Sequence, residues 1–332
     1  MVHDAIAFDL VRPSSMEMAQ RGVACLMAGP ERPGQLSADA AAARMQGFLE
    51  YCQHAQVDLM RQVLAFQDGT MLASCLWVLS KGRTGAMYIP DLMEYPESAR
   101  PAGEALKIAS EDAKQAGASM AQVMLAASDV VAPNTLKLAG YDFLARLAYL
   151  ERGRHRFGWS RRGASAALPV GFDWLTWTPE RRSLFEDVIT KTYIDTSDCP
   201  KLAGVRHITD VLAGHQAVGQ FDPSLWLVLR HNGSAVGALL MARVPERSAL
   251  EIVYLGVTPD RRGCGCGRLL LDRAVAEHAR SGFNHLSLAV DEANRPAVRL
   301  YESAGFENVG ERQVFFRPLA RTSQVIEPAH IM

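Results

Sequence analysis

A short loop rich in glycine, arginine and cysteine is the part of this sequence that most clearly suggests chemistry. Residues 261–267 read Arg-Arg-Gly-Cys-Gly-Cys-Gly, between an apolar run typical of a buried strand and an amphipathic segment typical of a helix. The first N–H groups of a helix lack intrahelical partners, and the helix dipole places partial positive charge there. Glycines also let a ligand approach the main chain closely. The loop therefore predicts a phosphate or pyrophosphate site, with a plain tight turn as the alternative.

Two common phosphate loops do not fit this spacing. The P-loop of nucleotidases needs Gly-Lys-Ser/Thr, which is absent here. A dinucleotide fingerprint needs an acidic residue about 20 residues on, at the end of a second strand. A strand does follow at 286–290, but it leads through residues 291–296 into another helix. A different kind of phosphate-bearing ligand is therefore expected.

The sequence around this loop resembles the GNAT superfamily of N-acetyltransferases. Arg262-x-x-Gly265-x-Gly267 after a strand matches the acyl-CoA signature of that family. Asn294, Tyr301 and the Ala-Gly-Phe run at 304–306 match its next segment, and the resemblance covers roughly residues 225–316. It implies an α/β fold (α+β, with a mixed sheet), acetyl-CoA as co-substrate and no metal.

The resemblance also implies which residues hold the coenzyme. They are Leu255, Gly256, Val257, Arg262, Gly263, Cys264, Gly265, Cys266, Gly267, Arg268, Asn294 and Tyr301. Strand backbone near Leu255 and Val257 would run beside the pantetheine arm, and an N–H group there would stabilise the tetrahedral oxyanion. Asn294 either bonds the pantetheine or caps the following helix. Cys264 and Cys266 are expected to fill the loop rather than act as nucleophiles, since the family transfers acetyl directly.

Proton transfer needs a base for the ammonium and an acid for the departing thiolate. Glu251 opens the strand before the loop, as a Glu does in GNAT-like histone acetyltransferases, and apolar neighbours would raise its pKa toward neutrality. An exposed strand-end Glu is the alternative, and Asp195, Asp198 or an ordered water are rival bases. The family places a Tyr at Tyr301 as the general acid; the alternative there is a packing aromatic. Asp195 and Asp198 are also candidates for attracting a cationic acceptor.

The chain repeats itself. Gly140 aligns with Gly305 at an offset of 305 − 140 = 165, and the same offset places Gly117 on Gly282 without a gap. Two GNAT-like lobes in tandem are the economical interpretation. We expect a first domain at 1–150.

A basic linker is expected at 151–167, followed by a second domain at 168–320. The linker holds several arginines, one of which could reach the 3′-phosphate of CoA, although a solvated segment explains it as well.

The first lobe has lost the glycines. Ser98, Arg100 and Ala102 stand where Gly263, Gly265 and Gly267 stand in the second. A loop with side chains cannot bring its backbone as close to a pyrophosphate. In addition, Asp129 and Leu136 replace Asn294 and Tyr301. We therefore expect the first lobe to keep the fold without the catalysis.

Composition limits the remaining possibilities. The 332 residues suit two domains, and a net charge of −1 gives no electrostatic sign of nucleic-acid binding. The six scattered cysteines form no CxxC pair, so a reducing cytoplasm is expected. Neither a membrane span nor a signal peptide is expected, because no apolar run approaches 18 residues and the N-terminus lacks the leader pattern.

The prediction is an acetyl-CoA-dependent N-acetyltransferase that acts in its C-terminal lobe on a small-molecule or peptide amine, as a monomer or homodimer. The alternative is a non-catalytic acyl-CoA-binding or sensor protein.

Overall fold

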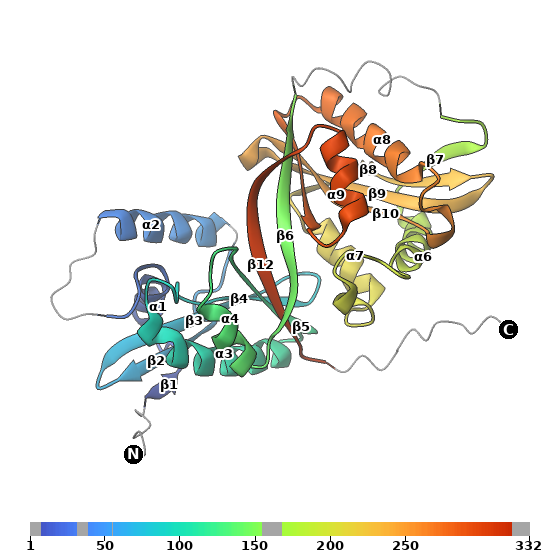
Figure 1. Ribbon diagram of the computed structural model, residues 1–332. Helices are drawn as coiled ribbons and strands as arrows, with labels where there is room; N and C mark the ends of the chain where they lie inside the picture. Colours follow the sequence, from blue (N-terminus) through green and yellow to red (C-terminus); the bar gives the residue numbers. More distant parts are fainter. Residues whose placement is uncertain (1–7, 32–38, 55, 155–167, 321–332) are drawn as a thin grey trace. The chain divides into compact units, whose positions relative to one another are not determined.

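The computed structural model describes residues 8–31, 39–54, 56–154 and 168–320, which divide into two compact units. The first unit holds the described residues of 1–144 and 313–320, and the second those of 145–312. Each unit is a mixed β-sheet flanked by helices (Figure 1), which agrees with the expected α/β class. In the part of the chain that the structure describes, no helix is both long and apolar enough to cross a membrane.

The first unit is a sheet in the order β1-β2-β3-β4-β5, followed by the C-terminal part of β12. Its own strands are β1 (Asp9–Val11), β2 (Gln62–Gln67), β3 (Thr70–Leu79), β4 (Thr84–Tyr88) and β5 (Met120–Ala126). Its helices are α1 (Met16–Ala28), α2 (Asp39–His54), the 3₁₀ turn η1 (Pro96–Ser98), α3 (Ala99–Gln115) and α4 (Ala132–Leu138). Alternate side chains of β2 pack with α3 on one face and with α1 on the other, because successive strand residues point to opposite sides.

The second unit is a sheet in the order β6-β11-β10-β9-β8-β7, next to the N-terminal part of β12. Its strands are β6 (Asp142–Gly153), β7 (Phe172–Thr176), β8 (Gln220–His231), β9 (Ser234–Val244), β10 (Ala249–Val257), β11 (His285–Asp291) and β12 (Glu307–Pro318). Its helices are α6 (Arg182–Thr192), α7 (Ile208–Gln216), α8 (Cys266–Ser281) and α9 (Arg295–Ser303). Its 3₁₀ turns are η2 (Pro179–Arg181), η3 (Pro200–Leu202), η4 (Pro245–Arg247) and η5 (Pro259–Arg261).

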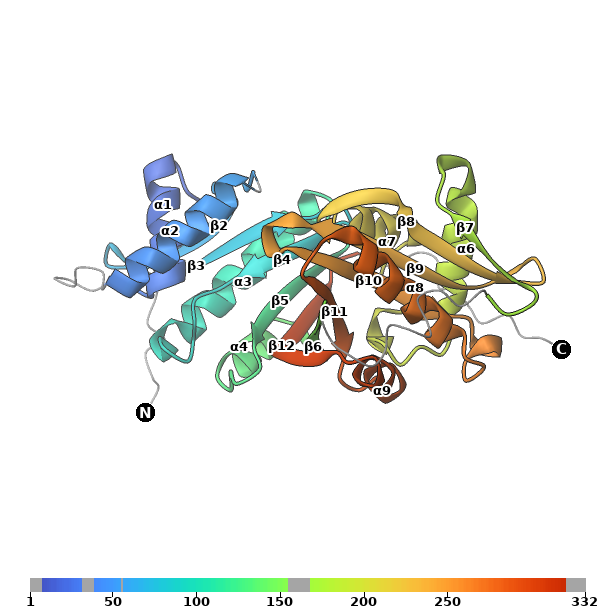
Figure 2. The same ribbon diagram turned by 90° about the horizontal axis from the view of Figure 1, so that it is seen from above.

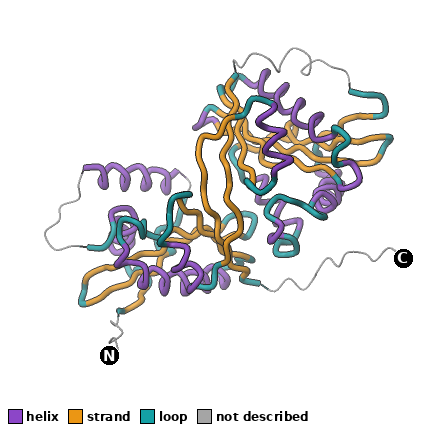
Figure 3. Tube along the Cα trace, in the orientation of Figure 1, coloured by secondary structure: helices purple, strands orange, loops and turns teal. Residues whose placement is uncertain are grey.

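Both faces of the second sheet are covered. Leu239 and Met241 of β9 join one core with α8 and α9, while Ala238 and Leu240 join another with α6 and α7. A central strand buried on both faces needs an unbroken apolar run, which is what β9 has. Viewed from above, α8 lies beside β10 (Figure 2), and Figure 3 distinguishes the helices of each unit from its strands by colour.

Two hairpin turns, each of two residues, connect adjacent antiparallel strands. Asp68 and Gly69 have φ of 49° and 78°, and Asn232 and Gly233 have φ of 49° and 81°. Two successive positive φ values are typical of the type I′ turn that joins adjacent antiparallel strands. The short polar sequences therefore fix the β2–β3 and β8–β9 connections.

The two halves exchange their last strands. β6 and β12 start at matching positions of the repeat, 307 − 142 = 165. β6 nevertheless pairs with β11 of the second unit from residue 147 to 153, and β12 from Gln313 onward belongs to the first unit. The boundaries expected from sequence, at 150 and 168, differ from this division because β6 continues as a paired strand to Gly153.

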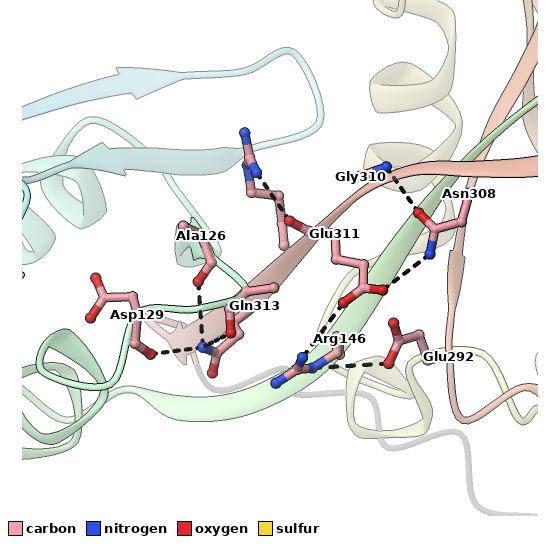
Figure 4. Close-up of polar contacts among 10 residues, drawn as sticks. Ala126, Asp129, Arg146, Glu292, Asn308, Gly310, Glu311 and Gln313 are labelled. Atoms are coloured by element: carbon pink, nitrogen blue, oxygen red, sulfur yellow. Dashed lines mark hydrogen bonds and ion pairs between the residues drawn. The ribbon is translucent and has the colours of Figure 1, made fainter.

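The side chains of β12 contact the second unit at Glu311 and the first unit from Gln313 onward (Figure 4). Within the second unit, Glu311 lies 3.5 Å from Arg146, which also faces Glu292 at 3.9 Å. Within the first unit, Gln313 donates from Nε2 to the carbonyl of Asp129 at 2.9 Å. The exchange therefore has side-chain support in each unit.

Of the linker arginines expected to reach a 3′-phosphate, Arg152 donates to the carbonyl of Ala304 at 2.9 Å and Arg154 to that of Ala279 at 3.3 Å. The other arginines of the linker lie outside the described residues.

Candidate functional site

The strands β10 and β11 part in the middle of the second sheet. They pair in parallel from Ala249 to Ile252 only, while β10 stays paired with β9 as far as Val257. The N–H of Thr258 bonds the carbonyl of Val236 on the β9 side. Because backbone groups alternate along a strand, those of Leu255 and Val257 face the side that β11 has left. This strand edge is oriented to pair with an amide-bearing ligand, although the carbonyl of Val257 already accepts from Nε of Arg262 at 3.3 Å.

The glycine loop leads into α8, and at Gly263 and Gly265 no side chain covers its backbone. Gly263 and Gly265 have φ of 75° and 83°, and a Cβ atom at either would meet nothing within 4 Å. The first intrahelical bond runs from Leu269 to the carbonyl of Gly265 at 3.1 Å, and no side chain caps the helix. The N–H groups of Gly265, Cys266 and Gly267 therefore precede the helical ladder, which is the position at which helix N-termini bind anions.

Packing within the protein requires glycine at position 256 but not at position 267. A Cβ at Gly256 would lie 2.5 Å from the hydroxyl of Tyr254, so that tyrosine requires the glycine. At Gly267 a Cβ would lie 3.4 Å from Leu300 of α9, which is ordinary contact. Gly267 thus tolerates a side chain as far as the protein is concerned, whereas Gly256 does not.

The guanidinium of Arg262 is bonded to the protein's own carbonyl groups. It donates to Asp195 at 2.8 Å, to Ile194 at 2.7 Å and to Thr192 at 2.9 Å, and its Nε reaches Val257 at 3.3 Å. Three of these carbonyls follow or end α6, where helix carbonyls lack partners and positive charge is favourable. Arg262 therefore fixes the α6–α7 loop to the end of β10, a role that sequence reasoning missed.

A carboxylate at the end of β11 holds the other end of the same loop. Asp291 accepts from the N–H of Cys199 at 3.2 Å, and its own N–H donates to Asp198 at 3.3 Å. Burial raises the pKa of Asp198. Asp195, in contrast, adopts a left-handed φ of 50° and contributes its carbonyl to Arg262. The two aspartates expected at the acceptor side thus both serve the loop's attachment in this structure.

Glu251 lies on β10 just before the strands part. Burial raises the pKa of its carboxyl, and the nearby Arg247 partly offsets that shift. The closest oxygen–nitrogen distance of this pair is 3.8 Å, which is an ion pair rather than a hydrogen bond. A half-buried carboxylate with a raised pKa is suited to accept a proton near neutral pH.

Tyr301 is almost fully buried on α9 and packs against Phe306, with ring centroids 5.7 Å apart. Burial raises the pKa of its hydroxyl, so the group stays protonated at neutral pH, as a general acid must. Asn294 caps α9 by accepting from Ala297 at 3.3 Å, which is one of its two expected roles.

The remaining loop residues have structural roles. Cys264 is exposed and Cys266 is buried, and burial raises the pKa of the Cys266 thiol, which disfavours its thiolate. Arg268 lies on the first turn of α8 and pairs with Asp272 at 3.0 Å. Nothing in these contacts requires a nucleophilic cysteine.

In the corresponding loop of the first unit, the backbone N–H groups are already bonded within the protein or are missing. The N–H of Ser98 bonds Tyr95, that of Ala99 bonds Pro96, and Pro101 has no N–H. Ser98 has an ordinary right-handed φ of −77°, and its hydroxyl is bonded to Leu72. The start of α3 thus lacks the row of free N–H groups found at α8.

Comparison with known proteins agrees with this geometry. Residues 194–306 match the Acetyltransferase (GNAT) family. A mycothiol acetyltransferase of Beutenbergia cavernae is 41% identical over 90 residues, which are 27% of this chain and 30% of that protein. Peptidyl-lysine N-acetyltransferase YjaB of Escherichia coli is 34% identical over 93 residues, which are 28% of this chain and 56% of that protein. The chain thus spans only 30–32% of the length of the first curated relatives it matches.

The similarity in fold extends further than the similarity in sequence. A GCN5-related N-acetyltransferase structure from Sphaerobacter thermophilus superposes with a TM-score of 0.58 at 18% identity, covering 94% of this chain and 96% of that one. At this identity the match concerns the fold, and it includes both units. The expected architecture of two such lobes in one chain is confirmed.

Proposed function

We propose, from the match of residues 194–306 to the GNAT acetyltransferase family, that this chain is an acetyl-CoA-dependent N-acetyltransferase working through its second unit. One observation carries the proposal: free N–H groups at the start of α8 lie beside an open edge of β10, and the first unit lacks that arrangement. The loop would bind the diphosphate of CoA, and the open edge of β10 would bind its pantetheine amides.

The reaction follows from the polar groups nearby. Glu251 takes a proton from the acceptor ammonium, and the freed amine attacks the thioester carbonyl. An N–H at the open edge of β10, from Leu255 or Val257, stabilises the oxyanion as the tetrahedral intermediate forms. The carbon–sulfur bond then breaks, and Tyr301 donates its proton to the departing thiolate. The nitrogen loses its second proton as the amide forms, and that proton restores the tyrosine hydroxyl through solvent. The products are an N-acetylated amine and CoA.

The acceptor is a primary amine on a small molecule or a peptide. Two of the curated relatives are named a mycothiol acetyltransferase and a peptidyl-lysine N-acetyltransferase, so amines of both classes belong in an assay panel. We place the protein in the cytoplasm, where acetyl-CoA is available and free cysteines such as Cys25 and Cys75 stay reduced.

Thiol release from acetyl-CoA with a panel of amines tests the proposal. Amine-dependent release is expected from the full chain. Absence of thiol release with every amine of the panel, together with a clear thermal shift on adding CoA, would instead indicate a non-catalytic acyl-CoA-binding protein.

A further inference from the structure

Three polar residues form a row across neighbouring strands of the second unit. Glu251 of β10 is paired with Ser287 of β11, which is paired in turn with Glu151 of β6. Directly paired residues lie on the same face of a sheet. The three side chains line one pocket together with Tyr149 and Arg247.

The central member of this row has an unused hydrogen-bonding group. Ser287 is 3% exposed, and its hydroxyl is buried without a hydrogen-bond partner among the described residues. Buried hydroxyl groups are nearly always bonded, because an unsatisfied one is destabilising. Because Ser287 also lines the pocket, a ligand donor that enters the pocket is a candidate for the missing partner of this hydroxyl.

The net charge of the side chains that line the pocket indicates which ligand charge the pocket favours. Arg247 bonds Glu151 at 2.9 Å but lies 3.8 Å from Glu251, so its guanidinium is committed mainly to Glu151. Two carboxylates and one guanidinium leave the lining with an excess of one negative charge. His285, 3.7 Å from Glu151, and Arg312, close to Tyr149, lie at the margin. A ligand with one positive charge and no negative charge neutralises the lining.

The repeat shows that the fold does not require this row. At the same offset of 251 − 86 = 165, the first unit has Ala86 and Gln122, paired in the same register as Glu251 and Ser287. Phe316 stands at the position of Glu151. The polar row belongs to the unit that keeps the glycine loop, which connects it with the reaction.

We propose that this row binds the acceptor, and that the acceptor is a monocationic amine without a carboxylate beside the amino group. The amino group lies between Glu251 and Ser287, whose hydroxyl accepts an N–H hydrogen bond. Glu151, held by Arg247, receives a neutral donor such as a hydroxyl or amide. A zwitterionic amino acid would leave the excess negative charge uncompensated. This inference rests on the proposed acetyltransferase function.

Matched amines test the inference in the thiol-release assay. Amino acid amides and methyl esters should be acetylated with kcat/KM at least about tenfold higher than the free amino acids. Ser287→Ala should raise the KM of the best amine about tenfold and leave the KM of acetyl-CoA unchanged. Ser234→Ala, which removes an exposed serine hydroxyl from β9, is the matched control and should change neither constant.

The thermal stability of Ser287→Ala gives a second readout that needs no acceptor. Removing an unpartnered buried hydroxyl should leave the melting temperature unchanged or raise it, whereas a hydroxyl with a structural role would lower it on removal. A lowered melting temperature, an unaltered amine KM or a preference for free amino acids would each overturn the inference. No amine-dependent release by the wild-type chain would instead overturn the proposed function, and the inference with it.

Discussion

Two glycines at opposite ends of α8 allow coenzyme binding to be separated from stability. Gly265 precedes the helix with φ of 83°, and Gly282 follows it with φ of 82°. A Cβ atom would meet nothing within 4 Å at either position. Gly265→Ala and Gly282→Ala therefore impose the same kind of backbone strain on the same helix. Only the first change places a methyl group where we expect the diphosphate.

The magnitudes follow from this geometry. A left-handed alanine costs roughly 1–2 kcal/mol, so both variants should lose that much stability. Gly265→Ala should also displace at least one N–H group from the diphosphate, and a hydrogen bond to a charged group is worth about 1.5–3 kcal/mol. That loss corresponds to CoA binding roughly 10- to 150-fold more weakly. Gly282→Ala should leave CoA affinity unchanged.

Isothermal titration with CoA, combined with denaturant unfolding of each variant, measures both effects. The expected pattern is equal loss of stability in the two variants and loss of affinity in Gly265→Ala alone. Equal CoA affinities in the two variants would refute the assignment of the loop.

Three further changes probe the remaining roles. Burial raises the pKa of Glu251, and the nearby Arg247 lowers it. The kcat/KM should therefore rise with pH at a pH above the usual glutamate range, and Arg247→Ala should move this rise to higher pH. A pH-independent kcat/KM in the wild type would exclude Glu251 as the base. Tyr301→Phe should reduce kcat about 100-fold without altering CoA affinity if its proton reaches the leaving sulfur; unchanged kcat would exclude that role. Arg262→Ala should lower the melting temperature and raise the acceptor KM, because the guanidinium binds the carbonyls of the α6–α7 loop. This variant should weaken CoA binding far less than Gly265→Ala does. A CoA affinity as low as that of Gly265→Ala would show that Arg262 binds the diphosphate instead.

Local sequence signals predicted much of the fold. Ser15 is a residue type that favours helix N-caps, and it caps α1 by accepting from the N–H of Met18. The Asp-Gly and Asn-Gly turns adopt the positive φ values that those residues favour. The start of α8 follows from its glycines. These features depend on residues close together in the chain, so a single sequence carries the information.

Features set by distant pairing were not predictable. Nothing local in residues 142–153 indicates that β6 pairs with β11 rather than staying with the first unit. The row of Glu151, Ser287 and Glu251 depends on the register of three strands far apart in sequence. Likewise, the charge of Arg262 suggested a phosphate ligand, but its partners are carbonyls some 70 residues earlier in the chain.

A crystal structure of the full chain grown with acetyl-CoA tests the central claim most directly. We predict one coenzyme per chain, with its diphosphate within hydrogen-bonding distance of the N–H groups of Gly265, Cys266 and Gly267. A coenzyme seated instead near residues 98–102 of the first unit, or none at saturating concentration, would contradict it.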